Sequence, residues 1–230
     1  MKNKLCMLLL ASGIGLFSCA EQDLPKEYTD SVNVFIGTGG HGHTFPGATL
    51  PHGMVQLSPD TRLLGWDACS GYYYDDTSIM GFTHTHLSGT GIGDYGDILF
   101  MPVVGEKPLI AGTAENPDEG YRSRFSHEQE SARPGYYQVL LQDDSINVEL
   151  TATLRAGLHR YTYPKASDAR LIVDMEPTIH GHQHPVTQIR VVNDSTIAGM
   201  KYTVGWAKHH YVYFYACLLY TSDAADDRIS

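Results

Sequence analysis

Residues 146–154 read INVELTATL, and their alternation indicates how the chain folds. Every second residue is apolar: Ile146, Val148, Leu150, Ala152 and Leu154. The residues between them are polar: Asn147, Glu149, Thr151 and Thr153. Successive side chains of a strand point to opposite faces of a sheet, so this period of two predicts a strand with one buried face. Asp143 and Asp144, just before it, favour a turn that closes a hairpin.

Similar short patterns surround this segment in the second half of the chain. We expect strands at residues 136–142, 158–163, 170–174, 186–192, 197–204 and 211–216, separated by Gly, Pro, Asn and Asp. Helical periodicity is hard to find in the sequence. Regular short strands without intervening helices predict an all-β fold, an antiparallel β-sandwich. Residues 134–137 (PGYY) mark the entry into this regular region, and the first half is richer in loops.

Two long segments hold most of the histidines and many of the glycines. They are residues 37–53 (GTGGHGHTFPGATLPHG) and 65–96 (GWDACSGYYYDDTSIMGFTHTHLSGTGIGDYG). Glycine lets a backbone approach a ligand closely, while His, Trp, Asp, Cys and Tyr supply donors, acceptors and flat apolar faces. Because aliphatic runs are almost absent from both segments, neither is ordinary core. We interpret them as long Gly- and His-rich binding loops carried by the sandwich.

The same loops resemble a known family. The stretches GTGGHGHTFPGATLPHGMVQLSPDT, GWDACSGYYY and GFTHTHLSGTGIGDYGDILFMP resemble the amino-terminal region of the glycoside hydrolase family 92 exo-α-mannosidases of the Bacteroides type, over roughly residues 27–216. This resemblance implies a two-domain, calcium-dependent, inverting enzyme. Its β-sandwich would precede a larger (α/α)6 barrel that carries the catalytic acid, the catalytic base and the calcium ligands. We therefore assign no catalytic residue and no metal ligand to this chain, and expect the missing carboxy-terminal barrel to be its partner.

The amino-terminal end predicts export. Residues 1–18 contain two lysines and an apolar stretch too short to span a bilayer, which is typical of a lipoprotein signal peptide. The run LFSC resembles a lipobox, so Cys19 is the expected lipidation site and residues 19–27 a tether. The alternative is a plain secretory signal with Cys19 incidental. With the lipobox, the protein would be lipid-anchored in the periplasm or on the cell surface, with the outer membrane as its partner.

Residues 28–216 are left for one sandwich domain, incomplete by comparison with the family. Residues 217–230 (CLLYTSDAADDRIS) have no apolar period and look like translated sequencing-adapter read-through, with a divergent terminus as the alternative. The net charge of −10, without basic clusters, argues against nucleic acid as a partner. Only one of the 4 cysteines, Cys69, lies well inside the domain, so no intrachain disulfide is expected.

Trp66 and Asp67 are the sharpest candidates for sugar binding. A tryptophan ring can cover the C–H face of a pyranose while a neighbouring carboxylate accepts hydrogen bonds from its hydroxyls. The alternative is that Trp66 is core and Asp67 caps a turn. Three further groups are candidates for substrate binding. Phe45 could form an opposing apolar wall, and Cys69 could be a small lining residue. His84, His86 and Ser88 offer donors and acceptors on a further loop. For Phe45, packing beneath its loop is an equally good interpretation.

Two other motifs are set aside. Residues 91–96 (GIGDYG) fit a dinucleotide-binding pattern, but no helix is expected after them. The histidine pairs and the trio at residues 180–184 have a spacing that zinc could use, yet cysteine partners and a HExxH helix are missing. Neutral histidines that bond a polyol or a backbone group are the preferred interpretation.

The sequence thus predicts the amino-terminal part of a secreted α-mannosidase that removes terminal mannose from glycans. In this interpretation the chain supplies sugar-binding loops and is inactive alone. The main alternative is a non-catalytic carbohydrate-binding lipoprotein of a glycan-uptake system. A secreted His-rich metal-binding protein is the weakest of the three hypotheses.

Overall fold

The computed structural model describes residues 27–165 and 168–220 and consists of strands joined by loops and short 3-10 helices. The strands are β1 (Ala48–Thr49), β2 (Gln56–Asp60), β3 (Ser78–Ile79), β4 (Gly81–Thr83), β5 (Leu99–Val104), β6 (Ser123–Arg124), β7 (Glu130–Arg133), β8 (Tyr136–Leu141), β9 (Ile146–Ala152), β10 (Gly157–Thr162), β11 (Ala169–Asp174), β12 (Gln183–Asn193), β13 (Thr196–Val204) and β14 (His210–Cys217). The helices are η1 (Tyr28–Ser31), η2 (Trp66–Ala68), η3 (Pro117–Glu119), η4 (His127–Gln129) and η5 (Ile179–Gly181). None of these helices is long and apolar enough to cross a membrane.

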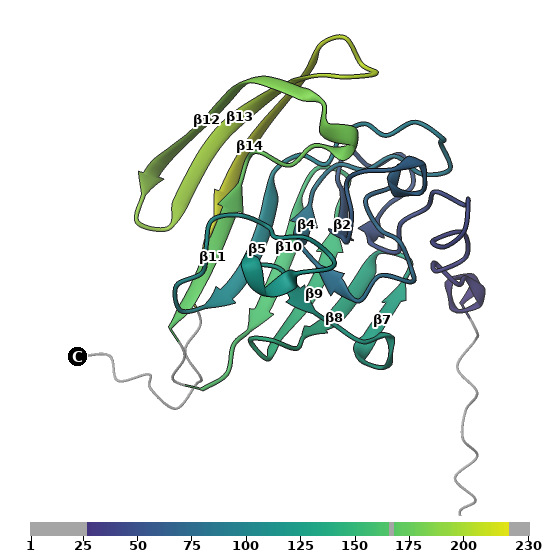
Figure 1. The fold of residues 1–230 in the computed structure, drawn as a ribbon, viewed down its shortest axis with the longest axis horizontal. Helices are drawn as coiled ribbons and strands as arrows, with labels where there is room; N and C mark the ends of the chain where they lie inside the picture. Colours follow the sequence, from purple (N-terminus) through teal and green to yellow (C-terminus); the bar gives the residue numbers. More distant parts are fainter. Residues whose placement is uncertain (1–26, 166–167, 221–230) are drawn as a thin grey trace, which may run out of the picture.

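All strand pairs are antiparallel, and they form three main sheets (Figure 1). One sheet has the order β1-β2-β4-β5-β11, a second has the order β10-β9-β8-β7, and a third has the order β12-β13-β14. Strands β3 and β6 form a separate pair. The prediction of an antiparallel β-sandwich is confirmed.

The strands expected in the second half of the chain are all present, with ends that shift by at most three residues. The hairpin at Asp143 and Asp144 joins β8 to β9, whose ladder begins where Leu141 faces Ile146. One detail of the predicted pattern is wrong: Leu154 is 56% exposed rather than buried. Strand β9 ends before it, and the backbone turns there, with Thr153 N donating to Ala156 O at 2.8 Å.

The sandwich core lies between the first two sheets. The buried face of β9 consists of Ile146, Val148 and Leu150, each at most 1% exposed. These residues pack with side chains from β8 and, across the sandwich, from β2, β4 and β5: Tyr137, Val139, Leu141, Leu57, Phe82 and Met101. Burial of one such side chain contributes about 1.5–3 kcal/mol. The alternation in the sequence therefore accounts for one wall of this core.

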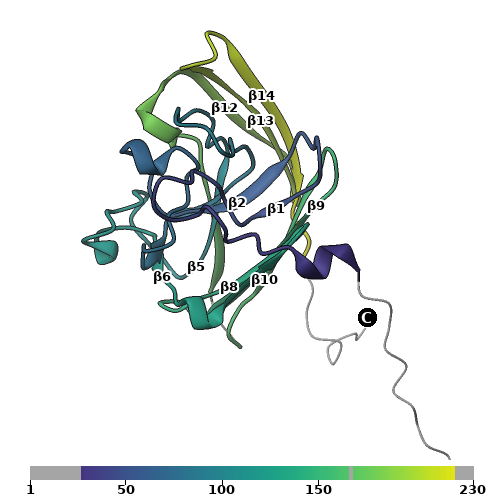
Figure 2. The ribbon, with the colours of Figure 1, turned by 90° about the vertical axis from the view of Figure 1, so that its right-hand side faces the viewer.

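The third sheet packs on the opposite side of β5 and β11. A small cluster of Ile98, Phe100 and Met175 contacts residues of β13 and β14 there, and Figure 2 shows β12, β13 and β14 along one side of the molecule, away from β8. Lys201 of β13 is fully buried at this junction and donates to Pro177 O. Strand β12 extends beyond the junction, where Val191 is 77% exposed.

The first half of the chain, expected to be rich in loops, consists of strands β1 to β7, most of them short, joined by long connections. One glycine shows how closely these loops pack. A Cβ at Gly47 would lie 2.2 Å from Leu57 O, so the loop approaches β2 only because this residue is glycine. The predicted signal peptide, Cys19, most of the tether and residues 221–230 lie outside the described residues.

Candidate functional site

Four segments far apart in the sequence meet at one end of the sandwich. They are residues 37–47, η2, residues 84–98 and η5, which precedes β12 at the upper end of the sandwich in Figure 1. Backbone hydrogen bonds join them: His180 N donates to Leu63 O at 2.7 Å, Ile179 N to Tyr95 O at 3.0 Å, and Gly89 N to His43 O at 2.6 Å. The predicted binding loops therefore form one continuous surface.

Trp66 is the exposed centre of this surface. Trp66 is the first residue of η2 and is 53% exposed, so it is not part of the core. The indole nitrogen donates to Gly91 O at 3.1 Å, which fixes the ring. Two imidazoles pack against it: the centroids of His41 and His43 lie 4.8 and 4.4 Å from its ring. We call these four residues, His41, His43, Trp66 and Asp67, the Trp66 cluster.

Asp67 supplies the negative charge of the Trp66 cluster. His41 Nδ1 donates to its Oδ1 at 2.6 Å, and His43 Nε2 lies 3.7 Å from the same oxygen. The hydrogen bond from His41 lowers the pKa of the Asp67 carboxyl, with a smaller contribution from the charge of His43. The carboxylate is therefore ionised at neutral pH and accepts hydrogen bonds only.

Cys69 and His180 lie directly behind the Trp66 cluster. The thiol of Cys69 is buried, donates to Trp66 O at 2.8 Å and lies 3.6 Å from His180 Nε2. Burial raises the pKa of this thiol, and the nearby Asp67 carboxylate raises it further. His180 Nε2 also donates to Gly65 O at 2.9 Å. Cys69 is thus a neutral packing residue rather than an activated nucleophile.

Two of the predicted site residues lie beneath the loops. His86 is 3% exposed and has a full set of partners: Asp60 Oδ1 at 2.9 Å, Thr83 Oγ1 at 3.1 Å and Gln56 O at 2.7 Å. Phe45 is half-buried against the sandwich core, and its ring lies 5.1 Å from that of His86. The two rings support the loops that carry the Trp66 cluster.

His84 and Ser88 are placed differently again. His84 points inward between two sheets, where its Nδ1 donates to Ile98 O at 2.7 Å and its Nε2 lies 3.0 Å from His159 Nε2. Burial lowers the pKa of His84 to about 4. Ser88 is exposed on the loop next to Gly89. Of the seven predicted residues, the structure therefore brings Trp66, Asp67 and Cys69 together.

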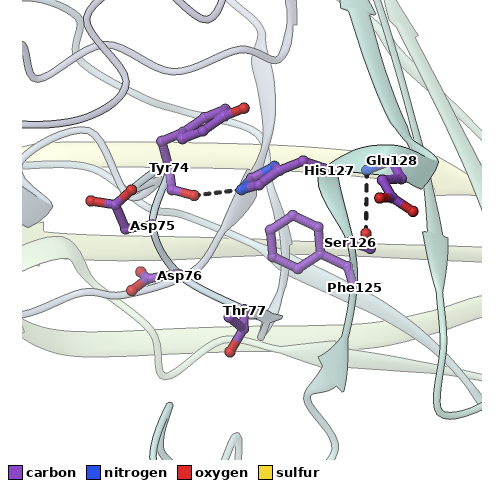
Figure 3. A pocket seen from close by; sticks show the side chains of 8 residues that line it. All are labelled: Tyr74, Asp75, Asp76, Thr77, Phe125, Ser126, His127 and Glu128. Atoms are coloured by element: carbon purple, nitrogen blue, oxygen red, sulfur yellow. Dashed lines mark hydrogen bonds between the residues drawn. The ribbon is translucent and has the colours of Figure 1, made fainter.

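A hollow lined by residues 74–77 and 125–128 (Figure 3) has a volume of about 390 Å³. Two of its polar side chains, His127 and Asp76, already have partners. His127 stacks on Tyr74 at 4.0 Å, and its two ring nitrogens bond Glu130 Oε2 and Tyr74 O, each at 2.6 Å. Asp76 pairs with Arg62. This hollow lies between residues 74–77 and 125–128, and its histidine and the Asp76 carboxylate bond within the protein.

The described part of the chain contains no group of three or more His, Cys, Asp or Glu side chains placed to hold a metal ion. The histidines with zinc-like spacing bond backbone and carboxylate oxygens instead: His180 with Gly65 O, His182 with Gly93 O, and His184 with Glu176. Within residues 27–165 and 168–220, the side chains therefore do not fit the calcium that the family resemblance implies.

Our list of substrate-binding candidates did not include His41, His43 and His180. The first two lie in the same glycine-rich loop as Phe45, and the glycine- and histidine-rich composition of that loop could have pointed to them. His180 approaches Cys69 from a position 111 residues later in the chain. No local pattern indicates such a contact, because it depends on how the third sheet docks.

The chain is similar to a known family and to several solved structures. The model of the glycosyl hydrolase family 92 N-terminal domain matches residues 31–222. A family GH92 alpha-mannosidase from Bacteroides thetaiotaomicron, also solved in complex with mannoimidazole, is 48% identical with a TM-score of 0.79, over 82% of this chain and 25% of that chain. A family GH92 inverting mannosidase from the same organism is 28% identical with a TM-score of 0.60, over 78% of this chain and 24% of that chain.

A further relative is described as an uncharacterized secreted glycosidase of Arthroderma benhamiae. It is 32% identical over 142 residues, which are 58% of this chain and 17% of that protein. The chain therefore spans a quarter or less of the length of these relatives.

Proposed function

The chain belongs to glycoside hydrolase family 92 through its N-terminal domain, and we propose that it is the sugar-recognition part of an exported exo-α-mannosidase. The proposed substrate is the terminal mannose of glycans, because two relatives are mannosidases. The observation that supports a binding role is the Trp66 cluster, where a half-exposed indole adjoins an ionised carboxylate. Inversion at the sugar carbon is proposed because one relative is an inverting mannosidase.

In this proposal the Trp66 cluster positions the sugar and does not transfer protons. The indole covers the C–H face of the pyranose, and Asp67 accepts hydrogen bonds from its hydroxyls. A glycosidase also needs two carboxyl groups across the scissile bond, one of them with a raised pKa. Asp67 has a lowered pKa and is bonded to His41, so it does not suit the acid. We propose that the acid, the base and the ligands of a calcium ion belong to a barrel domain that partners this one.

The test is kinetic and uses the longer enzyme that carries this domain. Trp66→Ala and Asp67→Ala should each lower kcat/KM for an aryl α-mannoside without unfolding the protein. For Asp67→Ala we expect a loss of about tenfold to a hundredfold, because a hydrogen bond to a charged group contributes about 1.5–3 kcal/mol and 1.4 kcal/mol is about tenfold in rate.

Trp206→Ala is the matched control, since Trp206 is 62% exposed in the loop before β14, outside the Trp66 cluster. It should keep wild-type kinetics. If Trp66→Ala and Asp67→Ala keep wild-type kcat/KM while their melting temperatures fall sharply, both residues serve the fold and the proposed function is wrong. Binding of mannosides with no hydrolysis by the longer protein would instead favour the non-catalytic carbohydrate-binding alternative.

We also propose that the protein is exported and anchored to the outer membrane through a lipid on Cys19. The support is the lipobox-like sequence, together with the name of the secreted relative. Cys19→Ala should release the mature protein from the membrane fraction, because a thioether-linked lipid would hold it there. A Cys19→Ala protein that still needs detergent for extraction would contradict the lipid anchor.

A further inference from the structure

His43 has a buried nitrogen without a partner inside the Trp66 cluster. Its side chain is 5% exposed, and its Nε2 bonds no other atom of the described residues. This nitrogen lies 3.7 Å from Asp67 Oδ1, and the ring meets Trp66 edge-on at 4.4 Å. Buried polar atoms are nearly always hydrogen-bonded, because an unpaired one loses its hydration without compensation. An orphan nitrogen beside an ionised carboxylate therefore points to a missing ligand atom.

We propose that His43 Nε2 and Asp67 Oδ1 together hold one hydroxyl group of the bound sugar. His43 donates to the hydroxyl oxygen, and the hydroxyl donates to Asp67. The separation of 3.7 Å is too long for a direct hydrogen bond, yet one oxygen can lie within hydrogen-bonding distance of both atoms. This inference rests on the proposed function and adds a binding residue to it.

The chemistry of the pair restricts the ligand group. An ionised Asp67 only accepts, and His41 already donates to the same oxygen, which has a second lone pair free. The ligand atom must therefore donate to Asp67 while it accepts from His43. A hydroxyl does both, whereas a methyl ether, a fluorine or a carbonyl oxygen only accepts. The Trp66 cluster should consequently discriminate strongly at one hydroxyl position of the sugar.

The backbone holds His43 in place for this role. Its φ of 54° lies in the left-handed region, and its carbonyl accepts from Gly89 N at 2.6 Å. The contact with Trp66 fixes the ring from the side. Because the imidazole is ordered before a ligand arrives, little rotamer entropy is lost on binding.

The experiment measures kcat/KM in the longer enzyme for 4-nitrophenyl α-mannoside and its monodeoxy and mono-O-methyl analogues. Wild type is compared with His43→Phe, His43→Gln and His184→Phe. His184 is the matched control, because it also has an unpartnered buried nitrogen but bonds Glu176 outside the Trp66 cluster. His43→Phe should lower kcat/KM for the mannoside about tenfold, because the variant loses one hydrogen bond and leaves the buried partner group unpaired. On the one analogue that lacks the bridging hydroxyl, it should match wild type.

His43→Gln should recover most of the loss, since an amide can still donate, and His184→Phe should behave as wild type. An equal loss on all analogues would mean that His43 only supports the loop, and no loss on the mannoside would mean that it touches no ligand. If His43→Phe fails to fold, His43→Ala, which also removes the donor, replaces it on the same analogues and decides between these outcomes. If Trp66→Ala and Asp67→Ala are active as wild type, the proposed function fails; if they are impaired and His43→Phe is not, only this inference fails.

Discussion

Two half-buried histidines show, at the scale of single residues, how hydrogen bonds determine the protonation of a side chain. Ile98 O accepts from His84 Nδ1, so the neutral ring of His84 has only an acceptor at Nε2. His159 Nε2 therefore donates to it at 3.0 Å, and His159 Nδ1 accepts from the Tyr161 hydroxyl at 2.7 Å. His84 follows β4 and His159 lies on β10, so this neutral chain ties together the two sheets of the sandwich.

This chain predicts a loss of stability in mild acid. Burial lowers the pKa of His84 to about 4, and it lowers the pKa of His159 well below its ordinary value. Each folded-state pKa is below the unfolded one, so the contribution to stability is complete above about pH 6.5 and is lost as pH falls from there toward 4. The loss from His84 is at most about 3 kcal/mol, at about 1.4 kcal/mol per pH unit. Urea unfolding at pH 7.5 and pH 4.5 measures it.

The variant that checks this origin is His84→Gln. Glutamine does not titrate, so the difference in unfolding free energy between the two pH values should shrink by a large part of that amount. His209→Gln is the control, because His209 is exposed in the loop before β14. Should both variants lose as much stability in acid as wild type, the effect comes from carboxylates elsewhere.

At the scale of elements, the third sheet is held to the sandwich by a buried ion pair. Lys201 of β13 and Asp97, which precedes β5, are both fully buried, with Nζ and Oδ1 separated by 3.6 Å. Burial lowers the pKa of Lys201, and the charge of Asp97 opposes that shift. Asp97 Oδ2 also accepts from Thr85 Oγ1 at 2.8 Å, so the pair reaches the loop that follows β4. Docking of β13 and the shape of the binding loops are therefore linked.

Removal of the ammonium should loosen this junction. Lys201→Met keeps the apolar stem but leaves the Asp97 carboxylate buried without its cation, which typically costs about 3–5 kcal/mol. Amide hydrogen exchange should accelerate in β12, β13 and β14 more than in β8 and β9. Lys208→Met, at an exposed lysine, should leave amide exchange unchanged both in β12, β13 and β14 and in β8 and β9. Uniform acceleration across all strands would show that the ion pair supports the whole domain rather than one sheet.

At the scale of the whole molecule, the described chain is a sandwich with one loop-covered end, and its recognisable chemistry is confined to that end. The Trp66 cluster is the proposed sugar-binding site, but its single carboxylate has a lowered pKa and a histidine partner. Proton transfer to a leaving group needs a carboxyl group that is protonated near neutral pH. The recognition role that we propose for this chain therefore requires no proton transfer by Asp67.

We therefore expect the 230-residue chain alone to hydrolyse no aryl α-mannoside, while the longer enzyme does so under the same conditions. Release of 4-nitrophenol, followed over hours at high protein concentration, is the measurement. A rate above the uncatalysed background that disappears in Asp67→Asn would contradict the assignment of this chain to recognition only.

The period-2 pattern of residues 146–154 predicted a strand with one buried face, and the strands of the second half follow from similar local patterns. Strand alternation is a property of the backbone itself, so sequence is sufficient to find it. The same holds for the composition of the loops, whose glycines and histidines indicated binding. Short strands such as β3 and β4 were not expected, because two or three residues carry no period of their own.

What only the tertiary structure decided is which loop residues lie in the Trp66 cluster and which lie beneath the loops. Spacing alone treats His43, His84 and His86 alike, yet one has an orphan nitrogen beside Trp66 and the other two bond groups beneath the loops. The approach of His180 to Cys69 likewise depends on the docking of a sheet more than a hundred residues later. Such contacts depend on which segments pack together in space, and that is a property of the whole fold rather than of any local pattern. The sequence alone therefore determined the sandwich and the chemical character of its loops, while packing assigned the individual side chains to the loop surface or to the interior.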